Sequence, residues 1–432
     1  MPNNVPRPET ENPVMDSVQP RSPRELAAVR SWDANDPLRA FRERFDLPPN
    51  VVYLDGNSLG ALPRATRQRV ADVVANEWGQ GLIRSWNDCD WIGAPRRVGD
   101  KIAGLIGAGP GEVIVADSTS ANLFKLVTVA LDARPGRHEV LSEPGNFCTD
   151  LYVIEGALRG MEGRTLRLEP ADRIINCISE DTALVVLTQV HYKSAAMHDM
   201  RAITARAHEK GALVLWDLSH SVGALQVDLN ACNADFAVGC GYKYLNGGPG
   251  APAFLFVAQR HQATSVSPLS GWMGHARPFD FVDPYAPAPG IERFLCGTPP
   301  ILGVLSLECG VDLLLEAGMA ALQAKSQRLC QLFITLVDEM CGEYGLRLES
   351  PTDPLQRGSH LAYAHPNGYA VMRALIDRGV IGDFRAPDTL RFGLTPLYTR
   401  YEDVWQAVAT LRDVLQTQCW SEPRYAVRAA VT

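Results

Sequence analysis

Residues 212–250 read ALVLWDLSHSVGALQVDLNACNADFAVGCGYKYLNGGPG, and this stretch decides the expected fold. It holds two short, nearly continuous apolar runs, ALVLWDL and ADFAVGC, which are typical of strands buried on both faces of a sheet. Each run leads into a charged residue, Asp217 after the first and Lys243 after the second. Both groups need a chemical reason to be there, because burying an unpaired charge is costly.

Similar apolar runs lie on both sides of this stretch, between about residues 112 and 260: EVIVAD, TALVVLTQV and APAFLFVA. Helical segments separate several of the runs, among them SANLFKLVTVAL and MHDMRAITARAHEKG, which Gly211 closes. This alternation predicts an α/β fold, in which a large domain has a mainly parallel, seven-stranded-type sheet flanked by helices.

The rest of the chain predicts the domain organisation. Residues 1–25, rich in Pro and Asn, are expected to form a flexible tail, and residues 26–65 an N-terminal segment that packs on a small domain. Residues 66–300 would form the large domain, and residues 301–432 a linking helix and a small C-terminal α+β domain. Pro63 is expected to open a helix whose apolar positions follow helical spacing, namely Val70, Val73, Val74 and Trp78.

Composition narrows the class of protein. The chain has 432 residues, of which 46% are hydrophobic, and a formal net charge of −8, which argues against nucleic acid as the main partner. Its ten cysteines form no CxxC pair and no zinc-ligand spacing, so they are expected to be reduced thiols without a metal. No apolar run approaches the ~20 residues of a membrane span, and we expect a cytoplasmic protein.

Four polar features map to the expected carboxyl ends of the strands, where α/β sheets bind ligands. We expect Lys243 to lie in a desolvated pocket, where a lysine can act as a nucleophile and form a Schiff base, whereas Asp217 could hold a protonated pyridine nitrogen. Residues 117–120 read DSTS at the start of a helix, which is a ready anion site. His220 follows Asp217 closely enough to touch the same ligand.

Each feature alone has a simpler interpretation. Asp217 could be a turn residue at a strand end, Lys243 a surface amine with a packed alkyl chain, and the Ser/Thr cluster only a helix cap. His220 could be a hydrogen-bonded core histidine. Their joint order along the chain favours binding of pyridoxal phosphate instead, because that cofactor requires a lysine, an aspartate and a phosphate site together.

Five motifs resemble the kynureninase family: YLDGNSLG at 53–60, WDLSH at 216–220, GYKYLNGGPG at 241–250, GWMGH at 271–275 and TPP at 298–300. The resemblance runs from about residue 35 to 416. It implies a pyridoxal-phosphate enzyme of the aspartate aminotransferase type (fold type I), and a homodimer with shared active sites. The implied reaction is hydrolysis of L-kynurenine to anthranilate and L-alanine in tryptophan degradation, with the 3-hydroxy substrate also expected.

The resemblance also implies roles for matching residues. Lys243 would carry the cofactor aldehyde, Asp217 would pair with the pyridine nitrogen, and Tyr242 would bind the phosphate and donate a proton. The remaining implied cofactor contacts are Thr119, Ser120, Phe147, Asp150, Thr188 and His220, with Trp272 and Thr298 reaching the phosphate from the partner subunit.

The substrate's carboxylate calls for a planar, bidentate cation, which favours an arginine. The candidate is Arg391 in TLRFGLTPLY, and Arg385 is its nearest rival. Aromatic candidates for the aniline ring are Trp86, Trp91, Trp272 and His275, and the sequence does not rank them.

Two alternatives stay open at this point. One is a related class-V aminotransferase or cysteine desulfurase, for which Cys296 and Cys330 would be available as nucleophiles. The other is a non-catalytic protein that binds pyridoxal phosphate. The Arg391 region argues against the second alternative, because a storage protein needs no substrate clamp.

Overall fold

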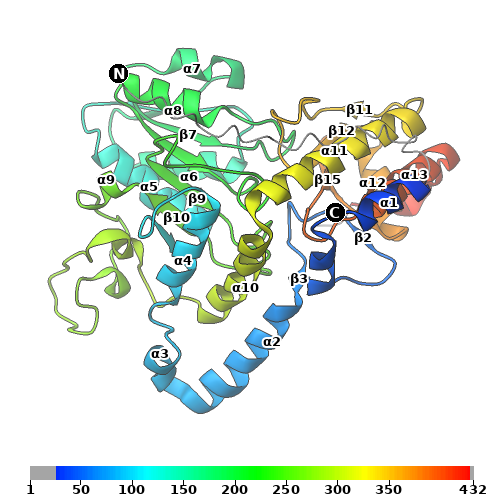
Figure 1. The fold of residues 1–432 in the computed structure, drawn as a ribbon. Coiled ribbons are helices and arrows are strands. Elements are labelled where there is room, and N and C mark those ends of the chain that lie inside the picture. Colours follow the sequence, from blue (N-terminus) through cyan, green and yellow to red (C-terminus); the bar gives the residue numbers. More distant parts are fainter. Residues whose placement is uncertain (1–25, 429–432) are drawn as a thin grey trace, which may run out of the picture.

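The computed structural model describes residues 26–428 and has a large part and a smaller part that two long helices connect (Figure 1). The large part contains a seven-stranded sheet in the order β4-β10-β9-β8-β7-β5-β6, in which only β10 runs antiparallel to its neighbours. The strands are β4 (Val113–Val115), β5 (Glu139–Ser142), β6 (Thr165–Leu168), β7 (Thr182–Thr188), β8 (Leu213–Asp217), β9 (Phe236–Gly239) and β10 (Phe254–Val257). The predicted fold class is confirmed.

The apolar runs form central strands because both faces of the sheet are covered. On β8, Val214 and Trp216 belong to one hydrophobic cluster, while Leu213 and Leu215 belong to another on the opposite face. The first face packs on α4 (Ala94–Leu105), α8 (Met200–Glu209) and α10 (Ile301–Ala317), and the second on α5 (Thr119–Asp132) and α6 (Cys148–Leu158). This two-sided burial explains the nearly continuous apolar sequence of the strands.

The smaller part is built on a four-stranded antiparallel sheet in the order β11-β12-β15-β14. Its elements are β11 (Arg347–Leu348), β12 (His360–Ala364), β14 (Asp383–Arg385), β15 (Thr389–Gly393), α12 (Gly368–Asp377) and α13 (Tyr401–Thr417). The helix α11 (Met319–Cys341) follows α10 and packs along α13 (Figure 1).

The N-terminal segment lies on this smaller part. Its helix α1 (Leu26–Ala34) packs against α13, and its strand β2 (Val52–Tyr53) pairs in parallel with β13 (Val380–Ile381). Val29, Val52 and Leu54 accordingly share a hydrophobic cluster with residues of the small sheet. The domain limits drawn from the sequence stay a prediction, and the expected flexible tail at 1–25 lies outside the described residues.

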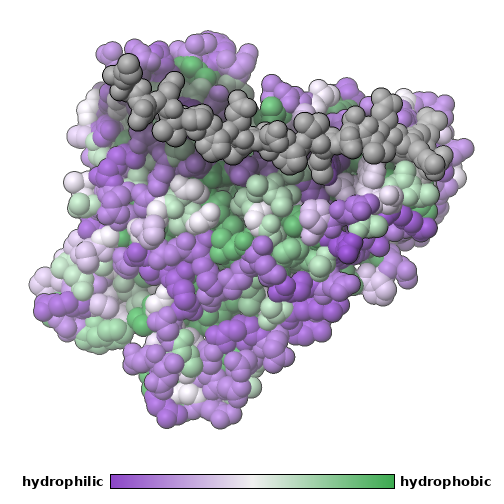
Figure 2. Space-filling view, viewed as in Figure 1, coloured by the Kyte–Doolittle hydropathy of each residue, from purple (hydrophilic) through white to green (hydrophobic). Residues whose placement is uncertain are grey.

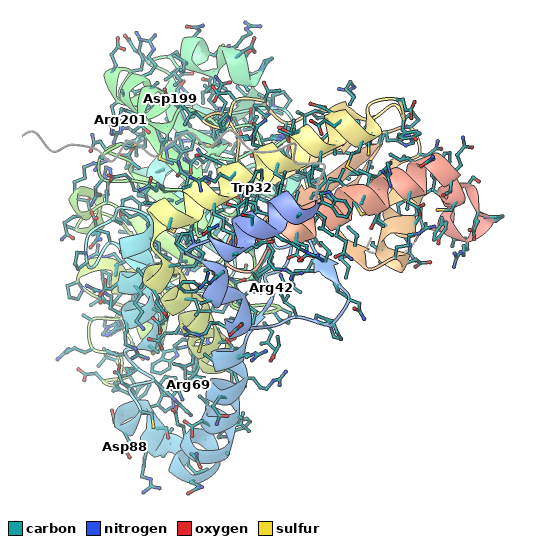
Figure 3. All side chains as sticks on the ribbon, turned by 45° about the vertical axis from the view of Figure 1, so that its right-hand side comes forward. Trp32, Arg42, Arg69, Asp88, Asp199 and Arg201 are labelled. Atoms are coloured by element: carbon teal, nitrogen blue, oxygen red, sulfur yellow. The ribbon has the colours of Figure 1, made fainter. Side chains whose placement is uncertain are left out.

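A helical arm projects from the large part (Figure 1), and Figure 3 labels Arg69 and Asp88 on it. It comprises α2 (Arg64–Asp72), the π-helical η2 (Val73–Gly81), η3 (Leu82–Arg84) and α3 (Ser85–Asp88). The helix predicted after Pro63 therefore exists, but its apolar positions do not form a core face within this chain. Val73 is buried, whereas Val74 and Trp78 are 43% and 57% exposed.

Short elements complete the described chain. They are β1 (Phe45–Asp46), β3 (Leu62–Pro63), α7 (Ile174–Cys177), α9 (Gln259–Gln262) and the 3-10 turns η1 (Arg39–Arg44), η4 (Ala171–Arg173), η5 (Trp272–Gly274), η6 (Gly290–Phe294), η7 (Cys419–Ser421) and η8 (Pro423–Tyr425). Most of the face seen in Figure 2 is hydrophilic. Across residues 26–428, no helix has both the length and the apolar character that a membrane span requires.

Candidate active site

A cavity of about 350 Å³ lies where the carboxyl ends of the central strands meet the N-terminus of α5. Four loops surround it: the turn before α5, the turn before α6, the segment after β8 and the segment after β9. The lining residues are Asp117, Ser118, Thr119, Ser120, Phe147, Thr149, Asp150, Asp217, Ser219, His220, Cys240, Tyr242, Lys243, Gly250, Ala251 and Ala253. The structure therefore brings together most of the residues that the sequence singled out.

Lys243 lies at the floor of this cavity and is 9% exposed. Its Nζ is 3.5 Å from His220 Nε2, and it lies 5.7 Å and 5.9 Å from the ring centroids of Phe147 and Tyr242. Among residues 26–428, no carboxylate forms an ion pair with this amine. A buried amine between aromatic rings, without a fixed counter-ion, is suited to covalent chemistry with an aldehyde.

Two buried carboxyl groups, Asp217 and Asp150, face the cavity from β8 and α6. Asp217 is 2% exposed, and its Oδ1 accepts a 2.7 Å hydrogen bond from the Ser219 amide. Burial, and then the neighbouring Asp217 carboxylate, raise the pKa of Asp150 well above its ordinary value. Asp150 Oδ1 has no hydrogen-bond partner within the described chain. The pair can therefore receive a cationic N–H donor.

Thr188 lies outside the cavity lining but contacts this carboxyl pair. Its register partner on β8 is Asp217, and its hydroxyl donates to Asn146 Oδ1 at 2.5 Å and to Asp150 Oδ2 at 3.4 Å. The hydroxyl thus fixes the orientation of Asp150 rather than reaching the cavity itself.

His220 is 3% exposed and is held in a cationic neighbourhood. Burial, and then the charges of Lys243 and other nearby groups, keep the pKa of His220 well below its ordinary value. The ring is therefore neutral at physiological pH and can act as a flat wall beside the lysine. A second buried imidazole, His360, has its ring centroid 5.6 Å away and was not identified from the sequence.

Thr119 and Ser120 begin α5 and line the cavity. Ser118 caps the helix, with its Oγ accepting from the Ala121 amide at 3.3 Å. The first amides of a helix have no acceptor within the helix, so they point to an anion placed beyond its end. The cavity therefore combines an anion site, a buried amine and a carboxyl pair.

Two further predicted residues border the same space. Phe147 lines it and makes an edge contact with Tyr192 at a centroid distance of 5.4 Å. Burial raises the pKa of Tyr242, so its phenol stays protonated and can donate a hydrogen bond.

Four predicted residues lie away from the cavity of the single chain. Trp86 packs on Trp91 within the helical arm, with ring centroids 5.8 Å apart. His275 is 9% exposed, and its Nδ1 accepts from the Arg277 amide. Trp272 is 37% exposed, and Thr298 is also exposed. None of the four lines the cavity, so the contacts predicted for them are not made within this chain and stay predictions.

Arg391 also lies outside the lining, and its guanidinium is already engaged. It is 1% exposed, and its Nε donates to Asp383 Oδ1 at 2.7 Å while Nη2 bonds to Asp383 Oδ2. Nη2 also donates to Ser58 Oγ at 3.1 Å, and Nη1 donates to the Tyr192 carbonyl. Arg385, the rival, bonds to the same Asp383 at 2.7 Å.

Several lining residues carried no signal in the sequence. Ser219, Cys240, Thr149 and the small residues Gly250, Ala251 and Ala253 reach the cavity only through loop geometry. The segment 55–60 was identified only as part of the motif YLDGNSLG, without a role, and in the structure the Gly60 amide donates to the Tyr242 carbonyl at 2.8 Å. The segment therefore supports, from the side of the smaller part, the loop after β9 that carries Lys243 (the lysine loop).

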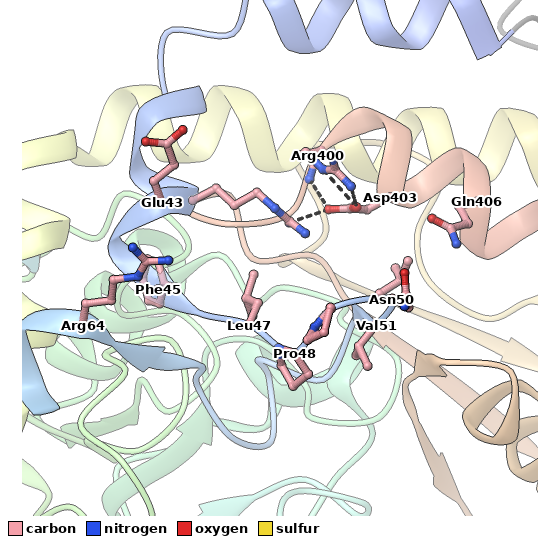
Figure 4. Close-up of a pocket in the computed structure, with 13 residues that line it drawn as sticks. Glu43, Phe45, Leu47, Pro48, Asn50, Val51, Arg64, Arg400, Asp403 and Gln406 are labelled. Atoms are coloured by element: carbon pink, nitrogen blue, oxygen red, sulfur yellow. Dashed lines mark hydrogen bonds and ion pairs between the residues drawn. The ribbon is translucent and has the colours of Figure 1, made fainter.

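A separate cavity of about 390 Å³ lies between residues 42–52 and the start of α13 (Figure 4). Its arginines are already paired: Arg42 and Arg400 both bond to Asp403, at 2.7 Å and 2.6 Å. Arg64 bonds to Asp46 at 3.3 Å. This cavity therefore marks the joint between the N-terminal segment and α13, and its three arginines are paired with carboxylates of the same chain.

The amino-acid sequence of the chain is similar to the sequences of known kynureninases. Residues 322–411 match the family described as kynureninase C-terminal domain. Curated kynureninases of Burkholderia pseudomallei (strain 1106a) and Pseudomonas fluorescens are 51% and 49% identical to this chain. Each match covers 93% of this chain and 98% of the relative.

The fold of the chain is also similar to the folds of solved structures. A cysteine desulfurase from Thermococcus onnurineus NA1 superposes with a TM-score of 0.75 over 88% of this chain and 98% of that chain, at 18% identity. The cystine C-S lyase C-DES, solved with its product cysteine persulfide, superposes with a TM-score of 0.73 over 84% and 98%, at 17% identity. At these identities the likeness concerns the fold alone.

Proposed function

The chain belongs to the kynureninase family, and from that premise we propose that it hydrolyses L-kynurenine to anthranilate and L-alanine through the residues around Lys243. Membership makes the protein a pyridoxal-5′-phosphate-dependent enzyme that cleaves kynurenine. The residue assignments and the acceptance of 3-hydroxy-L-kynurenine are part of the proposal. The observation that carries the assignments is the buried Lys243 amine, which shares one cavity with Asp217 and the start of α5.

The chemistry of the lining fits pyridoxal phosphate. Asp150 Oδ1 is a buried oxygen without a partner in the described chain, and together with Asp217 it suits the protonated pyridine nitrogen. Thr119, Ser120 and Tyr242 offer amide and hydroxyl donors to the phosphate. Phe147 and His220 would lie against the ring, and Lys243 would hold the aldehyde carbon.

Bound pyridoxal phosphate supplies an electron sink that stabilises negative charge at the substrate's α-carbon. Lys243 Nζ lies in the same cavity and would take the α-proton of the bound substrate and return it. His220 stays neutral and so leaves the amine free to accept that proton. Tyr242, with its raised pKa, retains the proton that it can donate to the carbon fragment that becomes alanine.

A cysteine desulfurase activity is disfavoured by the cysteines themselves. Cys330 is fully buried, and burial raises the pKa of its thiol to about 11. Cys296 does not line the cavity of the single chain. A nucleophilic cysteine needs access and a lowered pKa, and neither residue offers both.

Lys243→Ala tests the assignment of the lysine. The purified wild-type protein should show cofactor absorbance, and borohydride reduction followed by peptide mapping should place the adduct on Lys243. The variant should lose both the adduct and anthranilate release, while the control Lys210→Ala should retain them. An adduct on another lysine, or alanine release from cysteine instead of kynurenine, would contradict the proposal. The ratio of kcat/KM for kynurenine and 3-hydroxykynurenine tests acceptance of the second substrate.

We also propose that two chains complete each site. Trp272 and Thr298 are exposed, and Trp272 stands in an exposed aromatic group with Phe279 and Phe281 that suits a subunit contact. Mixed dimers test this directly, because a Lys243→Ala chain and a Trp272→Ala chain together contain one intact site. A 1:1 mixture reassembled at random should recover about one quarter of wild-type activity. Activity no higher than that of the separate variants would refute shared sites.

A further inference from the structure

Four charged groups meet where the segment 55–60 touches the small sheet: Asp55, Asp383, Arg385 and Arg391. Asp55 follows β2 and forms a bridge with Gly393 at the end of β15. Asp383 and Arg391 are cross-strand partners on β14 and β15. The cluster therefore joins the N-terminal segment to the strands that carry the proposed carboxylate clamp.

The two carboxylates are bonded very unequally. Asp383 is 3% exposed and receives Arg391 on both oxygens, and its Oδ2 also accepts from Ser58 Oγ at 2.8 Å and Arg385 Nη2 at 2.7 Å. Asp55 Oδ1 is buried and has no hydrogen-bond partner among residues 26–428. The Asp383 carboxylate is therefore the one that stays ionised, and the Asp55 carboxyl group is the one that can take up a proton.

When Asp55 is ionised, above about pH 7, the charges of the cluster balance before any substrate arrives, with two carboxylates against two guanidiniums. A substrate carboxylate at Arg385 and Arg391 adds a third negative charge in a largely buried setting. Two adjacent carboxylates in such a setting cannot both stay ionised without cost. This excess negative charge is neutralised at the lowest free-energy cost when the carboxyl group with the fewest hydrogen bonds takes up a proton.

We propose that Asp55 is a positioning residue for the substrate carboxylate, and that it takes up one proton when that carboxylate binds beside Arg385 and Arg391. This inference rests on the proposed function together with Arg391, the candidate for the substrate carboxylate, and its neighbour Arg385. Asp55 would touch neither substrate nor cofactor, but its protonation would control the net charge around Arg385 and Arg391, the proposed carboxylate clamp.

The directions of the pKa shifts of Asp55 and Asp383 agree with this proposal. Burial, and then the Asp383 charge, raise the pKa of Asp55 to about 7, while Ser58 and the two arginines oppose the rise. For Asp383, burial is outweighed by the hydrogen bond and charge of Arg391, so its pKa is lowered.

The other titratable groups around the cluster stay neutral near pH 7. Burial raises the pKa of Tyr53, on β2, and of Tyr398, after β15. Burial lowers the pKa of His360, on β12, well below its ordinary value. Of the described groups that face the clamp, Asp55 is therefore the one expected to titrate near neutral pH.

The sign of the pH dependence follows from this charge balance. Below pH 7 Asp55 is protonated, and the arginines can receive a further carboxylate without a proton entering. Above pH 7 Asp55 is ionised, and each binding event must bring in one proton. KM should therefore rise with pH above 7, by up to about tenfold per pH unit for a one-proton linkage.

The test compares Asp55→Asn with wild-type holoenzyme, measuring kcat and KM for L-kynurenine from pH 6 to 9. Asparagine has the size of the protonated acid but cannot ionise. Because other ionisations of substrate and enzyme affect both proteins, the ratio of wild-type to variant KM isolates Asp55. That ratio should be constant below pH 7 and rise up to about tenfold per unit above it. Asp55→Ser, which also lacks a carboxyl group, should give the same pattern if Asp55→Asn folds poorly.

Two controls separate this inference from the proposed function. Asp46→Asn removes a carboxylate that pairs with Arg64 and Arg67 outside the cluster, and its KM ratio should not depend on pH. Arg391→Lys should raise KM at every pH if the clamp is correct. A flat ratio for both Asp55 variants, with Arg391→Lys impaired, overturns the inference alone. A wild-type KM in Arg391→Lys overturns the clamp and the inference with it.

Discussion

Gly60→Ala probes how the segment 55–60 positions Lys243, the proposed catalytic lysine. The Gly60 amide donates to the Tyr242 carbonyl, so the two loops touch through their backbones. A Cβ at position 60 would lie 2.4 Å from the Lys243 carbonyl oxygen and 2.6 Å from Asn246 Oδ1. Since ordinary contact begins at 3.4 Å, the lysine loop must yield by about 1.0 Å (3.4 − 2.4).

A displacement of that size has a known consequence for rate. Misplacing a reacting group by about 1 Å costs on the order of 100-fold in catalysis. Overpacking of this kind typically destabilises the fold by ~1–3 kcal/mol. We therefore expect kcat to fall roughly 100-fold in a variant that still folds and still carries the reduced adduct on Lys243.

The assay follows anthranilate formation under saturating kynurenine, with thermal unfolding and borohydride mapping in parallel. Gly136→Ala is the matched control, because a Cβ there meets no atom within 4 Å. It should leave kcat and stability near wild type. A folded Gly60→Ala enzyme with wild-type kcat would refute the reasoning, since it would show that the lysine loop tolerates the shift or never needed this support.

Three further predictions concern buried charge and thiols. Hydrogen bonds from two histidines outweigh burial and lower the pKa of Asp235, so Asp235→Asn should cost about 3–5 kcal/mol of unfolding free energy near pH 7. Denaturant titration should show that difference shrinking as the pH falls through the acid range, where wild type also loses the ionised carboxylate. Lys325→Met should cost a similar ~3–5 kcal/mol because it leaves Asp36, 3% exposed and 2.7 Å from Lys325 Nζ, without its partner. Adding Asp36→Asn should recover much of that loss. Iodoacetamide at pH 8 should modify the exposed Cys148 and leave buried Cys330 intact in the native protein, as peptide mapping can show.

The central strands were predictable because burial on both faces of the sheet requires an apolar sequence. The runs around β7 to β10 are apolar at nearly every position, as two-sided packing demands. β6, TLRL, has no fully buried residue and lies at the sheet edge, so its sequence carries no comparable signal. β5, EVLS, lies next to it and has apolar residues only at its two central positions, and it was likewise not identified as a separate run.

The cavity residues were predictable where the sequence places an unusual group at the end of a buried strand or within a few residues of it. Asp217 and Lys243 satisfy that condition, and both line the cavity. Trp86 and His275 were selected only for their aromatic character, which does not specify position, and neither reaches the cavity of one chain. The helix after Pro63 shows the same limit, because its spacing indicates a helix but not which surface covers Trp78.

The pairing of Arg391 with Asp383 could have been found in the sequence by considering register. The segment DFRAPDTLRF contains two short strands, β14 and β15, separated by residues 386–388. An antiparallel hairpin of that length pairs residue 385 with 389, and therefore residue 383 with 391. An arginine buried before its substrate arrives must have a counter-ion inside the protein, because an unpaired buried charge is too costly. A carboxylate at the cross-strand position is thus expected beside the proposed clamp, and a substrate carboxylate bound there would redistribute charge among three carboxylates rather than fill an empty cation site.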